Sequence, residues 1–306
     1  MTSAKKKSPQ KKYSKTKLDR IFKQVENNWG VPEGFSDRVD PFIDGLYRHY
    51  FRVDLQGLEN IPEETILFVG NHNGLFTFET LMLTQAFLKH FKGRRRAVGL
   101  AHGVAIDNPM YKWISVRVGA IPAHPEVARE ALRRKVSLLV YPGGEKEAMR
   151  PYADRKKVDF YGRKGFLKLA LKSKVRIVPI VSVGAHESYI ILDRGEEFAE
   201  RLGLKKHLRI HGFPITAQSV FFLWCVVTGM VTFFPLLLAP GAFASIFIPL
   251  PTKMTFRILP PIDLRSWLKD GLTEDENLQQ LYDRFLTLMQ SVHSEEYAKR
   301  RFPVIG

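Results

Sequence analysis

The chain runs Thr65-Ile-Leu-Phe-Val-Gly70 and continues Asn71-His-Asn-Gly-Leu-Phe-Thr-Phe-Glu79. The first run is apolar and strand-like, and the spacing after it predicts a helix from Phe78 to about Phe91. An ionisable side chain, His72, is therefore expected at the tip of a strand. The carboxylate of Glu79 is expected just inside the helix that follows.

A histidine at a strand end has two interpretations. Taken alone, it more often caps a turn or bonds a backbone carbonyl than takes part in catalysis. A neighbouring carboxylate favours the second interpretation, because it fixes the imidazole tautomer and stabilises the imidazolium, which makes the ring a useful general base. Seven residues of straight helix span about 10 Å, too far for a hydrogen bond. The chain must therefore fold back at Asn73-Gly74, where glycine permits the turn.

The composition predicts a globular protein with negatively charged partners. Of the 306 residues 45% are apolar, which is ample for a core, and the net charge is +16. Residues 1–17 hold seven lysines and no acidic residue, so they are expected to form a basic disordered tail. Such a tail favours anionic lipid head groups; no nucleic-acid partner is expected, because no recognition module is present. The one cysteine, Cys225, excludes an intramolecular disulfide and a cysteine-based zinc site.

Strand and helix signals alternate along most of the chain and predict an α/β fold with a mixed, mostly parallel sheet flanked by helices. Residues 18–50 are expected to be an N-terminal helical segment, with helices over Leu18–Trp29 and Asp37–His49, and residues 51–306 form the main domain. The expected strands are 51–56, 65–70, 97–101, 137–141 and 177–183, and the further helices are 110–118, 125–134 and 165–172.

No charged residue lies between Arg209 and Lys253, and residues 220–238 are long and apolar enough to be a transmembrane candidate. Glycines and prolines interrupt this run, and the flanking segments 208–213 and 253–259 both resemble strands of the main domain. The chain would then leave and return on the same side. The sequence therefore predicts a re-entrant hydrophobic hairpin over residues 219–251, embedded in the membrane as a monotopic element at the cytoplasmic face.

Two further segments could carry chemistry. Val140-Tyr-Pro-Gly-Gly-Glu-Lys-Glu147 ends a strand in a turn that exposes backbone amides to a phosphate or carbonyl oxygen, or is an ordinary tight turn. Glu147 and Arg150 supply an ion pair or a contact to an anionic ligand, or form a solvated surface pair. Pro179 interrupts a buried strand, so a strand start, an edge or a bulge lining a cavity is expected there. His186 and Glu187 at its end are as consistent with structural as with functional roles.

Several of these segments resemble the glycerolipid acyltransferase family, which includes the lysophosphatidic acid acyltransferases. The motifs, in family order, are Gly57-Leu-Glu-Asn-Ile-Pro62, Asn71-His72 with a downstream carboxylate, Tyr141-Pro-Gly-Gly144 with Glu147, Ile177-Val-Pro-Ile-Val181 and Leu259-Pro-Pro-Ile-Asp-Leu264. The resemblance covers about Phe51 to Leu264. The Pro-Gly-Gly-x-x-Glu form looks like the diacylglycerol acyltransferase and ester synthase branches.

The resemblance implies a glycerol-phosphate acyltransferase-like fold and transfer of a fatty acyl group from acyl-CoA, the co-substrate, to the hydroxyl of a (lyso)glycerolipid or other lipid alcohol. It implies that His72 is the general base and Glu79 its orienting carboxylate, with no covalent enzyme intermediate and no cofactor. The implied substrate-binding positions are Asn71, Gly74, Tyr141, Pro142, Gly143, Gly144, Glu147, Arg150 and Pro179.

Two departures from the family pattern bear on the substrate. The commonest pattern has Asp five residues after the histidine, where this chain has Thr77. The motif at 119–124, Gly-Ala-Ile-Pro-Ala-His, lacks the arginine that ordinarily binds the acceptor phosphate, which favours a neutral lipid alcohol; Arg150, Arg155 or Arg163 could replace it. The alternatives are a 1-acylglycerol-3-phosphate acyltransferase, or a catalytically weak acyltransferase-like protein that binds lipid or membrane.

Overall fold

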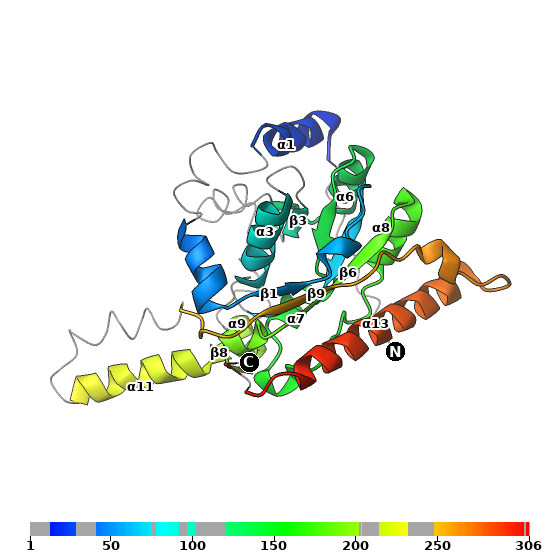
Figure 1. Cartoon of the computed structure of the whole chain (residues 1–306). Helices are drawn as coiled ribbons and strands as arrows, with labels where there is room; N and C mark the ends of the chain where they lie inside the picture. The colour runs from blue at the N-terminus through cyan, green and yellow to red at the C-terminus, as the bar shows by residue number, and fades with distance from the viewer. Residues whose placement is uncertain are drawn as a thin grey trace.

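A seven-stranded sheet forms the centre of the molecule (Figure 1). The structure is a computed structural model that describes residues 13–28, 41–74, 78–91, 97–101, 120–201, 203, 214–231, 248–302 and 304–305. The strand order is β1 (Asp54–Gln56), β9 (Thr255–Ile258), β6 (Ile177–Val183), β2 (Leu67–Gly70), β5 (Leu138–Val140), β3 (Val98–Ala101) and β4 (Ala120–Pro122). The five strands from β6 to β4 are mutually parallel. Strand β9 runs antiparallel to β6, and β1 runs parallel to β9. The mixed, mostly parallel α/β sheet expected from the sequence is confirmed.

Helices cover both faces of the sheet, which explains why β2 is apolar at every position. Leu67 and Val69 point to a core shared with α6 (Pro125–Arg133), α8 (Gly165–Ser173) and α13 (Glu274–Ala298). Phe68 points to the opposite core, under α3 (Phe78–Phe91). Side chains alternate between the two faces of a strand, so a strand buried on both sides has no polar face.

The shorter elements connect these layers. They are the π-helix η1 (Leu46–Tyr50), the 3₁₀ turns η2 (Leu58–Asn60), η3 (Tyr152–Asp154), η4 (His186–Ser188) and η5 (Leu264–Trp267), the helices α7 (Gly144–Ala148) and α9 (Glu196–Arg201), and a separate pair of strands, β7 (Ile191–Asp193) and β8 (Ile215–Thr216).

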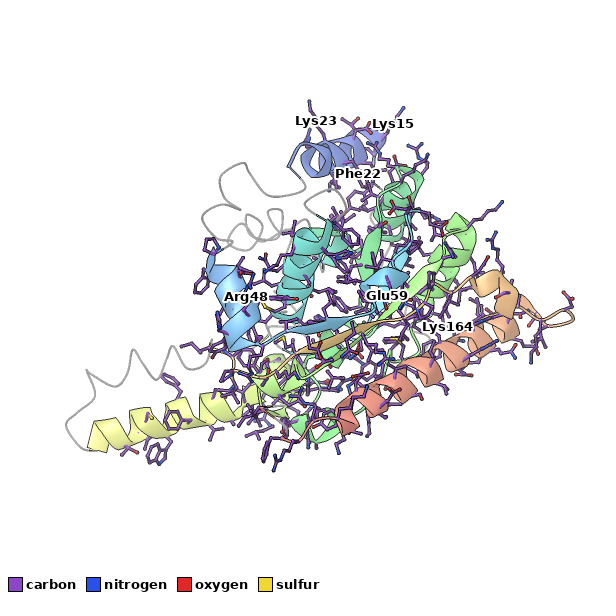
Figure 2. The ribbon with its side chains drawn as sticks, viewed as in Figure 1. Lys15, Phe22, Lys23, Arg48, Glu59 and Lys164 are labelled. Atoms are coloured by element: carbon purple, nitrogen blue, oxygen red, sulfur yellow. The ribbon has the colours of Figure 1, made fainter. Side chains whose placement is uncertain are left out.

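The N-terminal helix α1 (Lys15–Asn28) packs on the domain through one face. Phe22 is fully buried, whereas Lys15 and Lys23 point away from the domain (Figure 2). The helix begins at Lys15, inside the stretch 1–17 expected as a tail, while residues 1–12 lie outside the described part. Residues 41–50 are helical, as expected for the C-terminal part of 37–49. The helix expected at 110–118 and the strand expected at 208–213 also lie outside the described residues.

The helix α11 (Ala217–Val231) begins the segment expected to form the membrane hairpin. It projects from the body of the domain (Figure 1), and several large apolar side chains on it are exposed, Trp224 by 61%. Residues 232–247 are outside the described part, so the hairpin stays a prediction. Among the helices that the structure describes, none combines the length and hydrophobicity needed to cross a bilayer.

Pro179 lies within β6, an interior strand, at a place where the ladder is irregular. Ile180 pairs with Ile258 and the Pro179 carbonyl accepts from Leu259, but Ile177 pairs with Ile262, one residue further along. The neighbouring strand therefore holds one extra residue there, and this bulge accommodates a residue that cannot donate to the ladder. A strand start, an edge or a bulge was expected at Pro179, and the structure shows the bulge.

Candidate active site

The turn after β2 brings His72 and Glu79 together. Nδ1 of His72 lies 2.5 Å from Oε1 of Glu79, and Gly74 between them has φ +86°, a left-handed conformation that suits glycine. A Cβ at Gly74 would also lie 3.0 Å from the carbonyl oxygen of Ala185. The fold-back expected at Asn73-Gly74 is confirmed, and it places the carboxylate against the imidazole despite seven residues of separation.

The Glu79 carboxylate is completely buried and accepts hydrogen bonds at both oxygens. Oε1 accepts from His72 Nδ1 and from the Asn73 backbone N–H at 2.9 Å, and Oε2 accepts from Ser182 Oγ at 3.0 Å. Glu79 also lies in the first turn of α3, where the helix dipole favours a negative charge. These contacts offset the cost of burying the charge and hold the carboxylate in one place.

The His72 ring is fixed on a second side by Tyr141, which follows β5. The two rings stack with centroids 4.5 Å apart and an interplanar angle of 17°. The Tyr141 hydroxyl in turn accepts from Thr80 Oγ1 at 3.1 Å. With Nδ1 bonded to Glu79, Nε2 is the ring nitrogen available to a substrate, and the side chain is 12% exposed.

Ser182 is a residue of this site that the sequence reasoning did not single out. Its backbone N–H donates to Asn71 Oδ1 and its carbonyl accepts from Asn71 Nδ2, both at 2.8 Å, so Asn71 continues the β2–β6 pairing past the end of β2. Asn73 Nδ2 donates to Ser182 Oγ at 2.8 Å. The signal was available, because Ser182 is the one hydroxyl in the otherwise apolar strand Ile177–Val183.

Glu147 and Arg150 lie beneath the His72 loop and not on the surface. Glu147 Oε2 accepts from the His72 backbone N–H at 3.0 Å, and Arg150 NH2 donates to Asn73 Oδ1 at 2.5 Å. The two side chains face each other at 3.4 Å, with Glu147 completely buried and Arg150 2% exposed. The solvated-pair interpretation is therefore wrong. Burial raises the pKa of Glu147 to about 7, against the opposing effect of Arg150.

The Pro142-Gly143-Gly144 turn holds Glu147 close. A Cβ at Gly143 would lie 2.1 Å from Glu147 Oε2, so glycine is what lets this carboxylate pass under the turn. Arg163 NH1 donates to the carbonyls of Pro142 and Gly143, and the Gly144 N–H is bonded to the Tyr141 carbonyl. The Gly144 donor is thus already used within the turn, which weighs against its expected role toward a substrate oxygen.

The remaining residues, Pro179, His186 and Glu187, lie on and just after β6. Pro179 is three residues before Ser182 and lies within the sheet. His186 and Glu187 are buried, and burial, with the nearby Arg150 charge, lowers the pKa of His186 to about 3, which favours its structural interpretation. Within the described residues no group of three or more His, Cys, Asp or Glu side chains could hold a metal ion.

The arrangement has the parts of a proton-transfer site. An imidazole is held in one tautomer by a buried carboxylate, stacked on an aromatic ring, and left with one nitrogen free. Such a pair can take a proton from a hydroxyl while the carboxylate stabilises the imidazolium that forms. Its buried neighbours Asn71, Asn73, Glu147, Arg150 and Ser182 are hydrogen-bonded around the pair and hold it in position.

The chain is similar to several known proteins. Residues 52–183 match the family model described as Acyltransferase. An uncharacterized protein of Mycobacterium tuberculosis is 31% identical over 179 residues, 58% of this chain and 48% of that protein. The Gallus gallus protein named DGAT1/2-independent enzyme synthesizing storage lipids is 30% identical over 177 residues, 56% of this chain and 52% of that protein.

Phytyl ester synthase 2, a chloroplastic protein of Arabidopsis thaliana, is 27% identical over 152 residues, 47% of this chain and 21% of that protein. The chain thus spans about half the length of the first two relatives, and less of the third. A crystal structure of the 1-acyl-sn-glycerophosphate (LPA) acyltransferase PlsC from Thermotoga maritima superposes with a TM-score of 0.49 at 16% identity, covering 92% of this chain and 97% of that chain.

The matched residues 52–183 contain the whole site, from His72 and Glu79 through Tyr141 and Glu147 to Ser182. Over these residues the chain is similar to the acyltransferase family.

Proposed function

We propose that the chain is a membrane-associated O-acyltransferase that moves a fatty acyl group from acyl-CoA to the hydroxyl of a neutral lipid alcohol, with His72 as general base. The observation that carries the proposal is the 2.5 Å contact between His72 Nδ1 and Glu79 Oε1, which leaves Nε2 free. It weighs against the catalytically weak alternative, in which the carboxylate never reaches the imidazole.

The proposed reaction is one displacement at the thioester carbonyl. Nε2 of His72 takes the proton of the acceptor hydroxyl as its oxygen attacks the carbonyl carbon. The tetrahedral intermediate expels the CoA thiolate, the new ester C–O bond remains, and the imidazolium returns its proton to the sulfur. Glu79 stabilises the imidazolium between these two proton transfers. No residue of the chain becomes acylated.

A neutral acceptor fits the state of the arginines that could have bound a phosphate. Arg150 contacts Asn73 and Glu147, Arg155 donates to the Tyr297 hydroxyl, and Arg163 donates to two turn carbonyls. At the end of the 119–124 motif, His124 caps α6 by accepting from the Glu126 N–H. The names of the relatives, a storage-lipid enzyme and a phytyl ester synthase, point the same way.

Membrane association is supported by the surface of α11. Val220, Phe221, Leu223, Trp224 and Val227 are all exposed. An exposed apolar face of this size on a soluble surface marks an interaction site, and the net charge of +16 favours an anionic bilayer. The proposal places this face in the bilayer interface, on the side from which the acceptor lipid would come.

The test is turnover of the detergent-solubilised full chain. Labelled acyl-CoA is offered with diacylglycerol, monoacylglycerol, fatty alcohol or lysophosphatidate, and the wild type is compared with His72→Ala. The control is His90→Ala, which removes an exposed histidine from the same helix as Glu79. We expect ester from the neutral acceptors, lost in His72→Ala and kept in His90→Ala. Equal turnover in all three proteins would remove His72 as the base, and lysophosphatidate as the preferred acceptor would replace the neutral lipid.

A further inference from the structure

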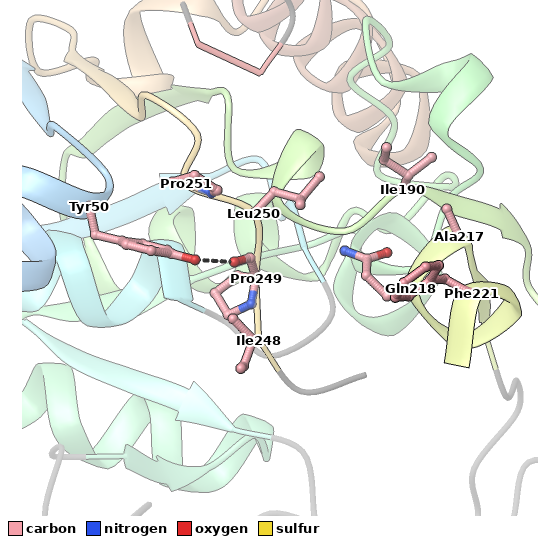
Figure 3. A pocket seen from close by; sticks show the side chains of 9 residues that line it. All are labelled: Tyr50, Ile190, Ala217, Gln218, Phe221, Ile248, Pro249, Leu250 and Pro251. Atoms are coloured by element: carbon pink, nitrogen blue, oxygen red, sulfur yellow. Dashed lines mark hydrogen bonds between the residues drawn. The ribbon is translucent and has the colours of Figure 1, made fainter. Parts of the chain in front are cut away.

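We infer that a cavity at the N-terminal end of α11 binds the hydrocarbon chain of the acceptor lipid and so positions the hydroxyl of that lipid relative to His72. The identity of the occupant as the acceptor rests on the proposed function, whereas the cavity and its chemistry do not. Nine residues line the cavity: Tyr50, Ile190, Ala217, Gln218, Phe221, Ile248, Pro249, Leu250 and Pro251 (Figure 3).

The size and lining of the cavity suit an alkyl chain. Its volume is about 410 Å³, within the range of small-molecule sites. Its walls come from α11, from the segment 248–251 that returns after the apolar stretch, and from Tyr50 at the end of η1. None of the nine lining residues is charged, and the nearby Arg52 guanidinium is bonded to the carbonyls of Tyr50 and Pro251. The lining itself therefore suits a hydrocarbon chain better than a phosphate.

The two polar side chains of the lining are used unequally. The Tyr50 hydroxyl donates to the Pro249 carbonyl at 2.5 Å, as Figure 3 shows. Gln218 Nε2 donates to the Ser188 carbonyl at 3.2 Å, but its Oε1 is buried without a partner. Both polar side chains are thus bonded or buried, and the surface that the cavity offers to a ligand is mostly apolar.

Two chains of contacts join the cavity to the His72–Glu79 pair. On one side, the Ser188 carbonyl accepts from Gln218 and from the Leu250 N–H, while Ser188 Oγ lies 3.5 Å from where a Cβ on Gly74 would be. On the other side, Tyr50 packs edge-on against Phe51, and Phe51 contacts Phe78, the neighbour of Glu79. The cavity is therefore linked through Ser188 and Phe51 to the loop and the helix that carry the pair.

The cavity is also continuous with the exposed apolar face of α11. Phe221 and Ile248 line it and are each 54% exposed. If that face lies in the bilayer interface, a lipid chain reaches the cavity without crossing water. This commits the occupant to a membrane lipid, which reaches the cavity from the bilayer, and not to the acyl-CoA chain.

The experiment is photolabelling of the full chain on phosphatidylcholine vesicles. The probe is a 1-monoacylglycerol with a diazirine in its acyl chain, and labelled peptides are mapped by mass spectrometry. Ala217→Phe fills the cavity, and Ala153→Phe makes the same change at an exposed position in η3. We expect label on the peptides containing residues 217–221 and 248–251. In Ala217→Phe the label per bound protein should fall about tenfold, which corresponds to ~1.4 kcal/mol of binding free energy. In Ala153→Phe it should be unchanged.

Equal labelling in Ala217→Phe and wild type, or stronger labelling of these peptides by a diazirine acyl-CoA, overturns the inference. Labelling needs no turnover, so a wild type that labels at the cavity but makes no ester overturns the proposed function alone.

Discussion

Replacing Glu79 by glutamine isolates the charge of the carboxylate from its geometry. Oε1 accepts from both His72 and Asn73, whereas Oε2 faces only the Ser182 hydroxyl, which can also act as an acceptor. The amide of Glu79→Gln should therefore keep its oxygen toward His72 and donate its NH₂ to Ser182. The histidine tautomer is preserved, and what is lost is the negative charge beside the imidazolium.

The size of the loss follows from the contact. Unit charges with centres about 4 Å apart attract by roughly 4 kcal/mol at an effective dielectric constant of 20. If this attraction is absent when His72 holds the proton, the rate falls by about 10³-fold, inside the range of 10²–10⁴ for general-base catalysis. Ser182→Ala removes one neutral donor from the carboxylate, at about 1 kcal/mol, so it should cost only about fivefold.

The assay is kcat/KM for a neutral acceptor at saturating acyl-CoA, with urea unfolding to show that each variant is folded. Glu197→Gln, an exposed glutamate in α9, makes the same chemical change away from the site. We expect the order Glu197→Gln, Ser182→Ala, Glu79→Gln from least to most impaired. A folded Glu79→Gln with turnover within about threefold of wild type would show that His72 needs no charged partner.

Three more changes follow from the structure. Gly143→Ala should abolish acyl transfer, because its Cβ would lie 2.1 Å from Glu147 Oε2 and displace this oxygen from the His72 backbone N–H. The control is Gly165→Ala, where a Cβ meets nothing within 4 Å, and it should keep full activity in the same assay. Burial raises the pKa of Glu147 to about 7 from its usual 4.5. Between these pH values the folded state keeps a proton that the unfolded state releases. The free energy of unfolding should therefore fall by about 3 kcal/mol as the pH rises through this range. Urea unfolding at pH 5 and pH 8 should show this fall in the free energy of unfolding for the wild type and no such fall for Glu147→Gln. The same pH dependence in both proteins would contradict the prediction. Trp224→Glu should weaken binding to anionic vesicles in a flotation assay, since it places a charge on the exposed apolar face of α11, and unchanged flotation would remove that face from the membrane contact.

The strands and helices that were predicted are each decided by a local apolar pattern, whereas α13 and the short strands β4, β7 and β8 were not singled out. The helix expected from Phe78 to about Phe91 has those bounds, and the strand at 177–183 is β6. Strand order is not local. Nothing in residues 253–259 shows that β9 inserts between β1 and β6 and runs opposite to β6. That placement depends on packing both faces of the sheet at once, which single-segment periodicity does not contain.

In the site, too, contacts between residues near in sequence could be expected, whereas contacts between distant residues could not. His72 and Glu79 are seven residues apart, so a glycine turn made their contact possible to expect, and the structure shows it. Ser182 reaches Glu79 across 103 residues of sequence, and its role depends on the β2–β6 pairing. Glu147 was expected to form an ion pair with Arg150, to supply a contact to an anionic ligand, or to lie in a solvated pair, and the structure shows the ion pair. Only the close passage under Gly143 shows that Glu147 also holds the His72 loop.

The unusual spacing of the carboxylate is compatible with the family's chemistry because catalysis depends on where the oxygen lies, not on the residue number. Gly74 reverses the chain at φ +86°, so the first turn of α3 comes back over His72. A carboxylate placed two residues further along that turn needs more reach, and glutamate has one methylene more than aspartate. The buried charge is then met by the Asn73 N–H, Ser182 Oγ and the positive end of the helix. Shortening the side chain in Glu79→Asp should therefore break the contact with His72 while leaving a carboxylate in place.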